Sequence, residues 1–120
     1  MTLVDSGKID GDSAISNTSW TDVLSTTVDL RRTNIVNFCF EYGGEITNRD
    51  VGIRLTVGGA EVMQDYHEPS RANGYRTVNF CTLVEAPEDL TSYTIALEAI
   101  VESSPQVVHV RRKSFWIMQQ

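Results

Sequence analysis

The sequence has few of the residues on which catalysis and metal binding usually depend. Its 120 residues include only two cysteines and two histidines. The cysteines have no CxxC spacing, so we expect neither a zinc site nor another cofactor. The GxSxG, HExxH, P-loop and GxGxxG motifs are also missing, which leaves hydrolase, metalloprotease and nucleotide-binding functions without a motif. We therefore predict that the chain is not an enzyme.

Long apolar runs and an excess of positive charge are absent too. No apolar run approaches the roughly 20 residues of a membrane helix. The opening "MTLVDSGKIDGDSAIS" lacks the basic start and apolar block of a secretory signal peptide. The formal net charge is −6, which argues against nucleic acid as the main partner, because phosphate binding needs a basic face. We expect no membrane partner, and a chain that stays in the cytoplasm of the cell that makes it unless it leaves as part of a particle.

One basic cluster, Arg111-Arg112-Lys113, stands against this acidic background. It lies inside a strand-like run, so one interpretation is a solvated or salt-bridged sheet edge. An anionic partner is the other interpretation.

Apolar residues alternate with polar ones along most of the chain from Trp20 onward. This period of two is typical of half-buried strands. It occurs in "TNIVNFCFEYGG", "DVGIRLTVGGAEVMQ", "YRTVNFCTLVEAP", "TSYTIALEAIVES" and "QVVHVRRKSFWIMQ". Gly58-Gly59 indicates a tight hairpin, and Pro87 is expected to end the third run. In the last run a bulge near the arginine pair would place Val108 and Val110 on the side of Phe115 and Ile117.

These runs predict an all-β fold with seven or eight strands and no helix. The best architecture is an antiparallel β-sandwich or jelly roll formed by residues 19–120. Residues 1–18 are rich in Ser, Asp, Gly and Asn, a composition suited to an extended N-terminal arm that is either flexible or docked.

The tetrapeptide "VNFC" occurs twice, at Val36–Cys39 and Val78–Cys81. The residues around the two copies do not match, so two strands that obey the same packing rule explain it better than a duplication. Without a signal peptide we expect both thiols to be reduced. Free cysteines are usually buried, so cysteines on the outer face indicate that a partner subunit covers this face. Together with the apolar residues of the arm, the candidate interface residues are Leu3, Val4, Ile9, Ile15, Cys39 and Cys81.

Two weaker candidates concern binding and catalysis. The aromatic residues could stack on sugars, as in carbohydrate-binding modules, although core packing explains them more simply; they are Trp20, Tyr42, Tyr66, Tyr75 and Trp116. The segment "DYHEP" supplies Asp65, His67 and Glu68 as an acid, a base or metal ligands, and its simpler interpretation is a polar loop after a hairpin.

The order "NFCFEYGG", "RLTVGGAEV", "NGYRTVNF", "LTSYTIALEA" and "VVHVRRKSFWIM" resembles that of the strands in small jelly-roll domains of phage and other virion proteins. It is also similar to tumour-necrosis-factor-like trimers. The resemblance implies a structural virion protein, such as a capsid decoration or cement protein that stabilises a capsid lattice. It also implies a homo-oligomer, a trimer or dimer, with a capsid or other virion protein as partner and the virion as its location. The alternative is a carbohydrate- or ligand-binding module, including a receptor-binding module of a tail fibre.

Overall fold

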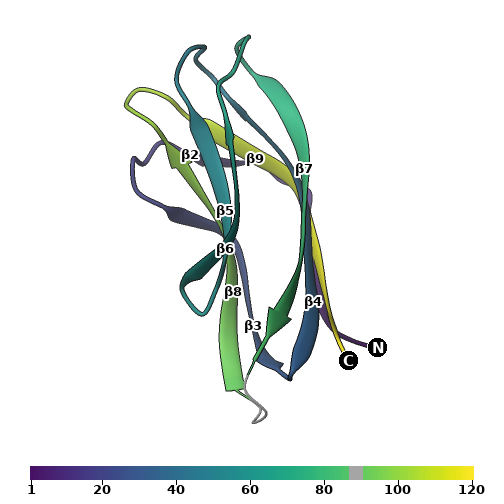
Figure 1. The fold of residues 1–120 in the computed structure, drawn as a ribbon. Coiled ribbons are helices and arrows are strands. Elements are labelled where there is room, and N and C mark those ends of the chain that lie inside the picture. Colours follow the sequence, from purple (N-terminus) through teal and green to yellow (C-terminus); the bar gives the residue numbers. More distant parts are fainter. Residues whose placement is uncertain (87–90) are drawn as a thin grey trace.

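The computed structural model describes residues 1–86 and 91–120, and within them the chain is built from strands without a helix (Figure 1). Nine strands are described, more than the seven or eight predicted, because the N-terminal segment adds two of its own. Pro87, predicted to end a strand, lies outside the described residues. The strands are β1 (Thr2–Ile9), β2 (Ser13–Ile15), β3 (Thr21–Leu30), β4 (Thr33–Gly44), β5 (Val51–Val57), β6 (Ala60–His67), β7 (Gly74–Glu85), β8 (Thr91–Val101) and β9 (Val108–Gln119).

The strands form two antiparallel sheets that pack face to face (Figure 1). One sheet has the order β1-β9-β4-β7, with β2 also paired to β9, and the other has the order β3-β8-β5-β6. The pairs are nested: β5 with β6, β4 with β7, β3 with β8, and β1 and β2 with β9. Such a chain is one long hairpin rolled into two sheets, which is the jelly-roll arrangement. The predicted all-β antiparallel sandwich or jelly roll is therefore confirmed.

The core lies between the sheets and follows the predicted alternation. Val36, Phe38, Phe40 and Tyr42 all point inward from β4 and are fully or almost fully buried. The ring of Phe38 stacks on that of Phe115, with centroids 5.1 Å apart. Apolar burial of this kind is the main favourable term in folding, so the inward side chains of β4 tie the two sheets into one unit.

Two backbone predictions are also confirmed. Gly58 and Gly59 connect β5 to β6 with φ angles of 59° and 83°, the left-handed conformation that glycine tolerates best. Strand β9 bulges near the arginine pair, where its register with β4 shifts and Arg112 has a φ of 52°. As a result Val108 and Val110 are buried on the same side as Phe115 and Ile117.

The N-terminal segment is extended and lies along β9 of its own sheet. β1 pairs with the second half of β9, and β2 pairs with Val108–Val110. The turn between them faces the bulge in β9, where Arg112 donates a backbone hydrogen bond to Asp10. An unpaired sheet edge exposes backbone donors and acceptors, and this segment satisfies those of β9. The boundary near residue 18 between an arm and a domain stays a prediction.

Candidate functional site

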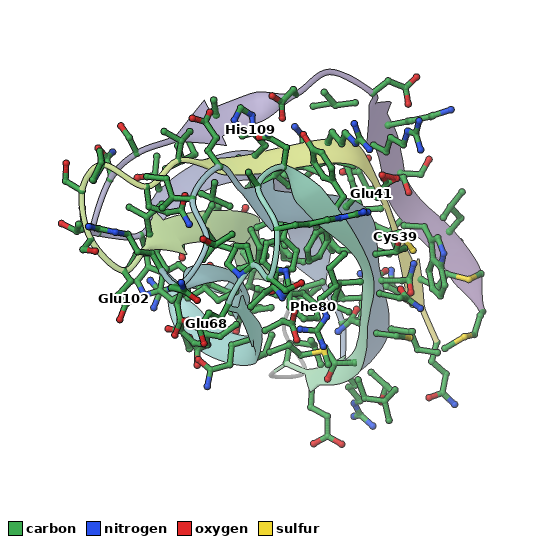
Figure 2. The ribbon with its side chains drawn as sticks, turned by 90° about the horizontal axis from the view of Figure 1, so that it is seen from above. Cys39, Glu41, Glu68, Phe80, Glu102 and His109 are labelled. Atoms are coloured by element: carbon green, nitrogen blue, oxygen red, sulfur yellow. The ribbon has the colours of Figure 1, made fainter. Side chains whose placement is uncertain are left out.

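The two VNFC segments are direct neighbours in the larger sheet. They pair antiparallel with Phe38 opposite Phe80, which places Asn37 opposite Cys81 and Cys39 opposite Asn79. Both phenylalanines point into the core, whereas the asparagines and cysteines share the outer face; Figure 2 shows Phe80 between the sheets and Cys39 on the outer side. The repeated tetrapeptide thus reflects one packing rule applied twice.

Cys39 interacts with two asparagines and not with Cys81. The Cys39 thiol donates to the Asn79 side-chain oxygen at 3.2 Å, and the Asn37 amide approaches the Cys39 sulfur at 3.6 Å. Cys39 and Cys81 lie on a diagonal of the ladder, where neighbouring residues are about 7–8 Å apart. Both are free in this structure.

An apolar row crosses the outer face at the end of the sheet where both chain termini lie (Figure 1). It takes one residue from each of four adjacent strands: Leu3, Met118, Ile35 and Leu83. Leu3 and Leu83, at the two ends of the row, are 56% and 66% exposed. Exposed leucines are common singly, but a continuous row of this kind is typical of contact surfaces. We call this surface the apolar row.

The two rows next to the apolar row are nearly uncharged. The first holds Ser6, Trp116, Asn37 and Cys81, and the second holds Lys8, Ser114, Cys39 and Asn79. Among the described residues of the β4–β7 ladder, acidic side chains come next on this face beyond these rows, at Glu41 and at Glu85. Depletion of charge at the centre of a surface patch is a compositional sign of an interface.

The predicted interface residues occupy different environments. Leu3, Cys39 and Cys81 share the outer face of the larger sheet, in three different rows. Val4 and Ile15 are partly buried and pack against the core cluster. Ile9, at the end of β1, is 45% exposed. Contact of these residues with a partner stays a prediction.

Sequence reasoning did not select the other members of the apolar row as interface residues. Ile35 and Leu83 could have been found, because both interrupt the polar face of an alternating strand. Met118 was harder to find, since the bulge in β9 obscures which face its residues occupy.

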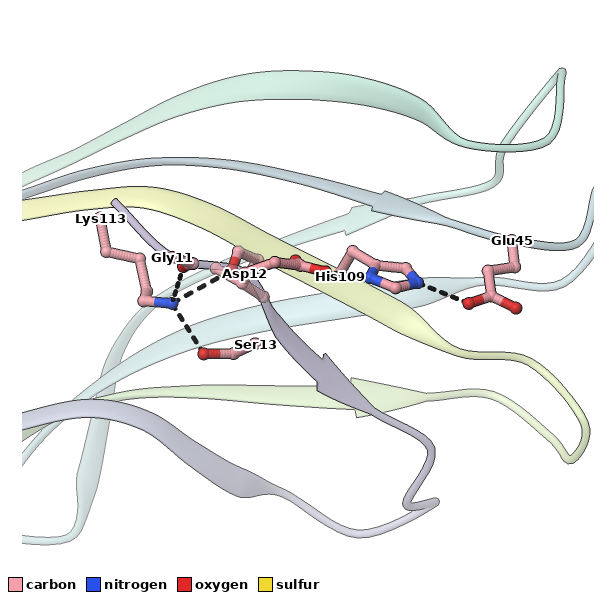
Figure 3. A network of polar contacts seen from close by, with 7 residues as sticks. Gly11, Asp12, Ser13, Glu45, His109 and Lys113 are labelled. Carbon is pink, nitrogen blue, oxygen red and sulfur yellow. Dashed lines mark hydrogen bonds and ion pairs between the residues drawn. The ribbon is translucent and has the colours of Figure 1, made fainter. Parts of the chain in front are cut away.

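His109 on β9 connects three segments that are distant in sequence (Figure 3). Its Nδ1 atom lies 2.5 Å from an oxygen of Asp12, in the turn between β1 and β2. Its Nε2 atom lies 2.5 Å from an oxygen of Glu45, just after β4. Burial by itself would lower the pKa of His109, but the hydrogen bonds to Glu45 and Asp12 outweigh it and raise that pKa. The protonated imidazole donates to both carboxylates at once.

Lys113, a buried residue of β9, holds the turn between β1 and β2 in place. Its side chain is 1% exposed, and its ammonium group donates to Gly11 O at 3.0 Å, Ser13 Oγ at 2.7 Å and Val110 O at 3.1 Å (Figure 3). A lysine has three donor hydrogens, so all of them are satisfied. Burial lowers the pKa of Lys113, and the nearby Asp12 opposes that effect.

The basic cluster is salt-bridged in part. Glu41 accepts from Arg111 at 3.2 Å and from Arg112 at 2.9 Å. The guanidinium of Arg111 also stacks on the ring of Tyr75, 3.5 Å from its centroid. The single carboxylate of Glu41 therefore pairs with two arginines, so the group of three side chains keeps a net positive charge.

The residues of "DYHEP" do not converge on one site. Asp65 accepts a hydrogen bond from the Tyr42 hydroxyl. It also forms an ion pair with Arg76, with 3.7 Å between the guanidinium nitrogen and the carboxylate oxygen. The ring of His67 packs edge-on against Tyr42, and Glu68 is exposed. Among residues 1–86 and 91–120, no group of three or more His, Cys, Asp or Glu side chains is arranged to hold a metal ion.

The aromatic residues are spread over the molecule. Tyr42 is buried in the core, whereas Trp20 and Tyr66 meet over the outer face of the smaller sheet with ring centroids 6.2 Å apart. Arg54 stacks on Trp20 there, 4.5 Å from the ring centroid. A hollow of about 190 Å³ beside them is lined in part by Tyr66 and Gly52. Among the five predicted aromatics, Trp20 and Tyr66 are therefore the pair whose rings are in contact in the described part of the chain.

No helix among the described residues has the length and apolar character needed to cross a membrane. No protein-family model matches the chain, and no curated protein matches it in sequence.

Several solved structures are similar to the chain in fold. The structure of T=1 particles derived from infectious bursal virus superposes with a TM-score of 0.67 and 12% identity, covering 97% of this chain. Latent PorU from Porphyromonas gingivalis gives 0.61 at 9% identity and covers 100% of this chain. The insecticidal delta-endotoxin Cry8Ea1 from Bacillus thuringiensis gives 0.51 at 12% identity and covers 87%.

This chain spans 31% of the bursal virus chain, 13% of PorU and 19% of the endotoxin. The matched region is therefore one part of each of these longer chains. At these identities the similarity establishes the fold alone, and the fold of this chain is the double-sheet jelly roll.

Proposed function

We propose that this chain is a structural protein of a virus particle that stabilises a capsid lattice as a decoration or cement protein. The observation that carries the proposal is a capsid-like jelly roll whose larger sheet presents the apolar row on a nearly uncharged outer face. Structural capsid proteins need such contact faces, because subunits must bury apolar surface against one another.

The occupant that fits this face is a second copy of the chain. With a formal net charge of −6, two copies repel each other over most of their surfaces. The apolar row and the two rows beside it carry no acidic residue, so this is where two copies approach at the lowest electrostatic cost. A dimer or trimer formed here would cover Cys39 and Cys81, the free thiols of this face.

Native mass spectrometry and light scattering at several concentrations test this assignment. Leu83→Asp should shift the discrete oligomer toward monomer, because it places a charge in the apolar row. The matched control is Val62→Asp, at a 40% exposed position on β6 of the other sheet, which should leave the mass unchanged. A monomer at every concentration, or equal effects of both variants, would refute the contact between copies.

The second candidate is a carbohydrate-binding module, and the pairing of Trp20 with Tyr66 beside a hollow favours it. Titration of a glycan panel should then change the fluorescence of Trp20. This change should disappear in Trp20→Phe and persist in Trp116→Phe. A flat response across the panel would eliminate this candidate.

A further inference from the structure

The loop between β6 and β7 borders a hollow that is rich in cationic side chains. Its volume is about 300 Å³, and it is lined by His67, Ser70, Arg71, Gly74, Tyr75 and Arg76. None of these lining residues is acidic, although the chain as a whole carries a formal net charge of −6. A concave site lined by one sign of charge concentrates ions of the opposite sign. We call this the oxyanion hollow.

The two arginines in the lining have complementary roles. Arg76 is held in place by Asp65, 3.7 Å away, and by donation to the backbone oxygen of Tyr66 at 3.4 Å. A guanidinium has five N–H donors, so these contacts leave donors for a ligand. Arg71 is exposed, and its guanidinium has no hydrogen bond or ion pair with the residues that the structure describes. It is therefore available to a ligand without losing an existing contact.

Tyr75 lines the hollow, and a contact with Arg111 holds its ring in position. Arg111 stacks on its ring, 3.5 Å from the centroid, and is itself paired with Glu41. Because Arg112 shares the same carboxylate, this neighbouring group adds net positive charge to the field around the hollow. Cation–π stacking of this kind is favourable and keeps the ring in one orientation.

The loop is shaped before any ligand arrives. Pro69 is buried, and its backbone oxygen accepts a hydrogen bond from Asn48 at 3.4 Å. Asn73 has a φ of 58° and donates its backbone N–H to Gly44 at 2.9 Å. The loop is thereby fixed at both ends, by Asn48 after β4 and by Gly44 at the end of β4. A preformed loop loses little conformational entropy when it binds, which favours affinity.

We propose that the oxyanion hollow binds a sulfate group, the chemistry shared by sulfated sugars and the free inorganic anion. The guanidinium groups of Arg71 and Arg76 match the paired oxygens of such groups, and the Ser70 hydroxyl adds a donor. The Tyr75 ring supplies an apolar face for a sugar ring. The hollow lies where Gly44 pairs with Gly74, at the end of the β4–β7 ladder opposite the apolar row. Binding here is therefore independent of the assembly contact.

Isothermal titration calorimetry at constant ionic strength tests the proposal with three probes: sodium sulfate, a sulfated disaccharide and the same disaccharide without sulfate. We expect both sulfated probes to bind and the neutral disaccharide not to bind. Arg71→Ala should weaken binding about tenfold, the loss expected for one charge-assisted hydrogen-bonding group. Arg71→Lys keeps the positive charge but loses the paired N–H donors of the guanidinium. Its affinity should therefore lie between those of the native chain and of Arg71→Ala. Arg31→Ala, an exposed arginine at the opposite end of the sandwich, should have no effect.

The two sources of the anion give different results. A sulfated disaccharide that binds more tightly than sulfate identifies an acidic glycan as the ligand, and equal affinities identify a free anion. In both cases the amide signal of Gly74 should shift in a ¹⁵N-correlated spectrum. Absence of binding by both sulfated probes, equal losses in Arg71→Ala and Arg31→Ala, or a Gly74 signal that does not move would overturn the proposal.

Discussion

Tyr42, near the C-terminal end of β4, carries a buried hydroxyl that joins the two sheets. It comes from β4 and donates a hydrogen bond to Asp65 on β6 of the opposite sheet. Burial and this hydrogen bond raise the pKa of Tyr42 far above its ordinary value, so the hydroxyl keeps its proton and remains a donor. Similar links connect Asp5 to Thr26 and Gln119 to Asp29 at other points between the sheets.

Replacement of Tyr42 by Phe should reduce the free energy of unfolding by about 1–2 kcal/mol, because it removes a hydrogen bond to a charged group without leaving a cavity. Urea denaturation measures this difference. Tyr93→Phe is the matched control, since the hydroxyl of that half-buried tyrosine makes no hydrogen bond with the described residues. Equal stability of the two variants would show that the link between Tyr42 and Asp65 contributes nothing.

His109 should make stability depend on pH in a defined direction. Its pKa is raised above the ordinary value of 6.5 in the folded chain, so the folded state holds the proton more tightly than the unfolded state does. The contribution of His109 is therefore complete below about pH 6.5 and is lost as the pH rises through the raised folded value. The charged groups that face this region are Asp12, Glu45 and, beyond Asp12, Lys113.

The measurement is the free energy of unfolding of the native chain and of His109→Gln between pH 5.5 and pH 9. The native chain should be the more stable at the acidic end, and the difference should shrink as the pH rises. A difference that grows with pH would mean that the imidazole is neutral between its two carboxylates.

At the scale of elements, β1 depends on a glycine for its close approach to β9. Gly7 lies over the ring of Phe115, and a Cβ atom at that position would be 2.5 Å from the ring. Phe115 cannot easily move away, because its other side stacks on Phe38. The contact explains why a residue that normally weakens strands occurs within β1.

Gly7→Ala should therefore destabilise the chain by about 1–3 kcal/mol, the usual cost of overpacking, although alanine is the better strand former. Hydrogen exchange should accelerate in residues 2–9 before it accelerates in β4. Gly11→Ala is the control, because a Cβ atom there would contact nothing within 4 Å. Unchanged exchange in Gly7→Ala would show that Phe115 adjusts without loss.

At the scale of the whole molecule, the two sheets share one core and should unfold together. Phe38 lies at the centre of this core with no exposed surface, so Phe38→Ala should reduce stability by about 3–5 kcal/mol. Trp20 reports on the smaller sheet and Trp116 on the larger one, and single-tryptophan variants should give coincident transitions. Separate transitions would show that the larger sheet, with the N-terminal segment on it, melts independently.

Local patterns were sufficient to predict most of the strands. The alternation of Val36, Phe38, Phe40 and Tyr42, the Gly58-Gly59 hairpin and the bulge beside Arg112 are all properties of short segments, because backbone sterics and burial act on neighbouring residues. The all-β class follows from these features. The N-terminal strands were not predicted as strands, because β1 and β2 gain their stability from pairing with β9 about a hundred residues away, and not from their own composition.

Residue type and local spacing were enough to predict which residues of β4 face inward, the sign of the net charge and the absence of the common catalytic motifs. Which strands are neighbours became clear only from the folded chain. Strand pairing joined the two VNFC segments, assembled the apolar row from four strands and placed His109 between Asp12 and Glu45. The physical reason is that these contacts depend on long-range strand pairing, which no local pattern in the chain encodes.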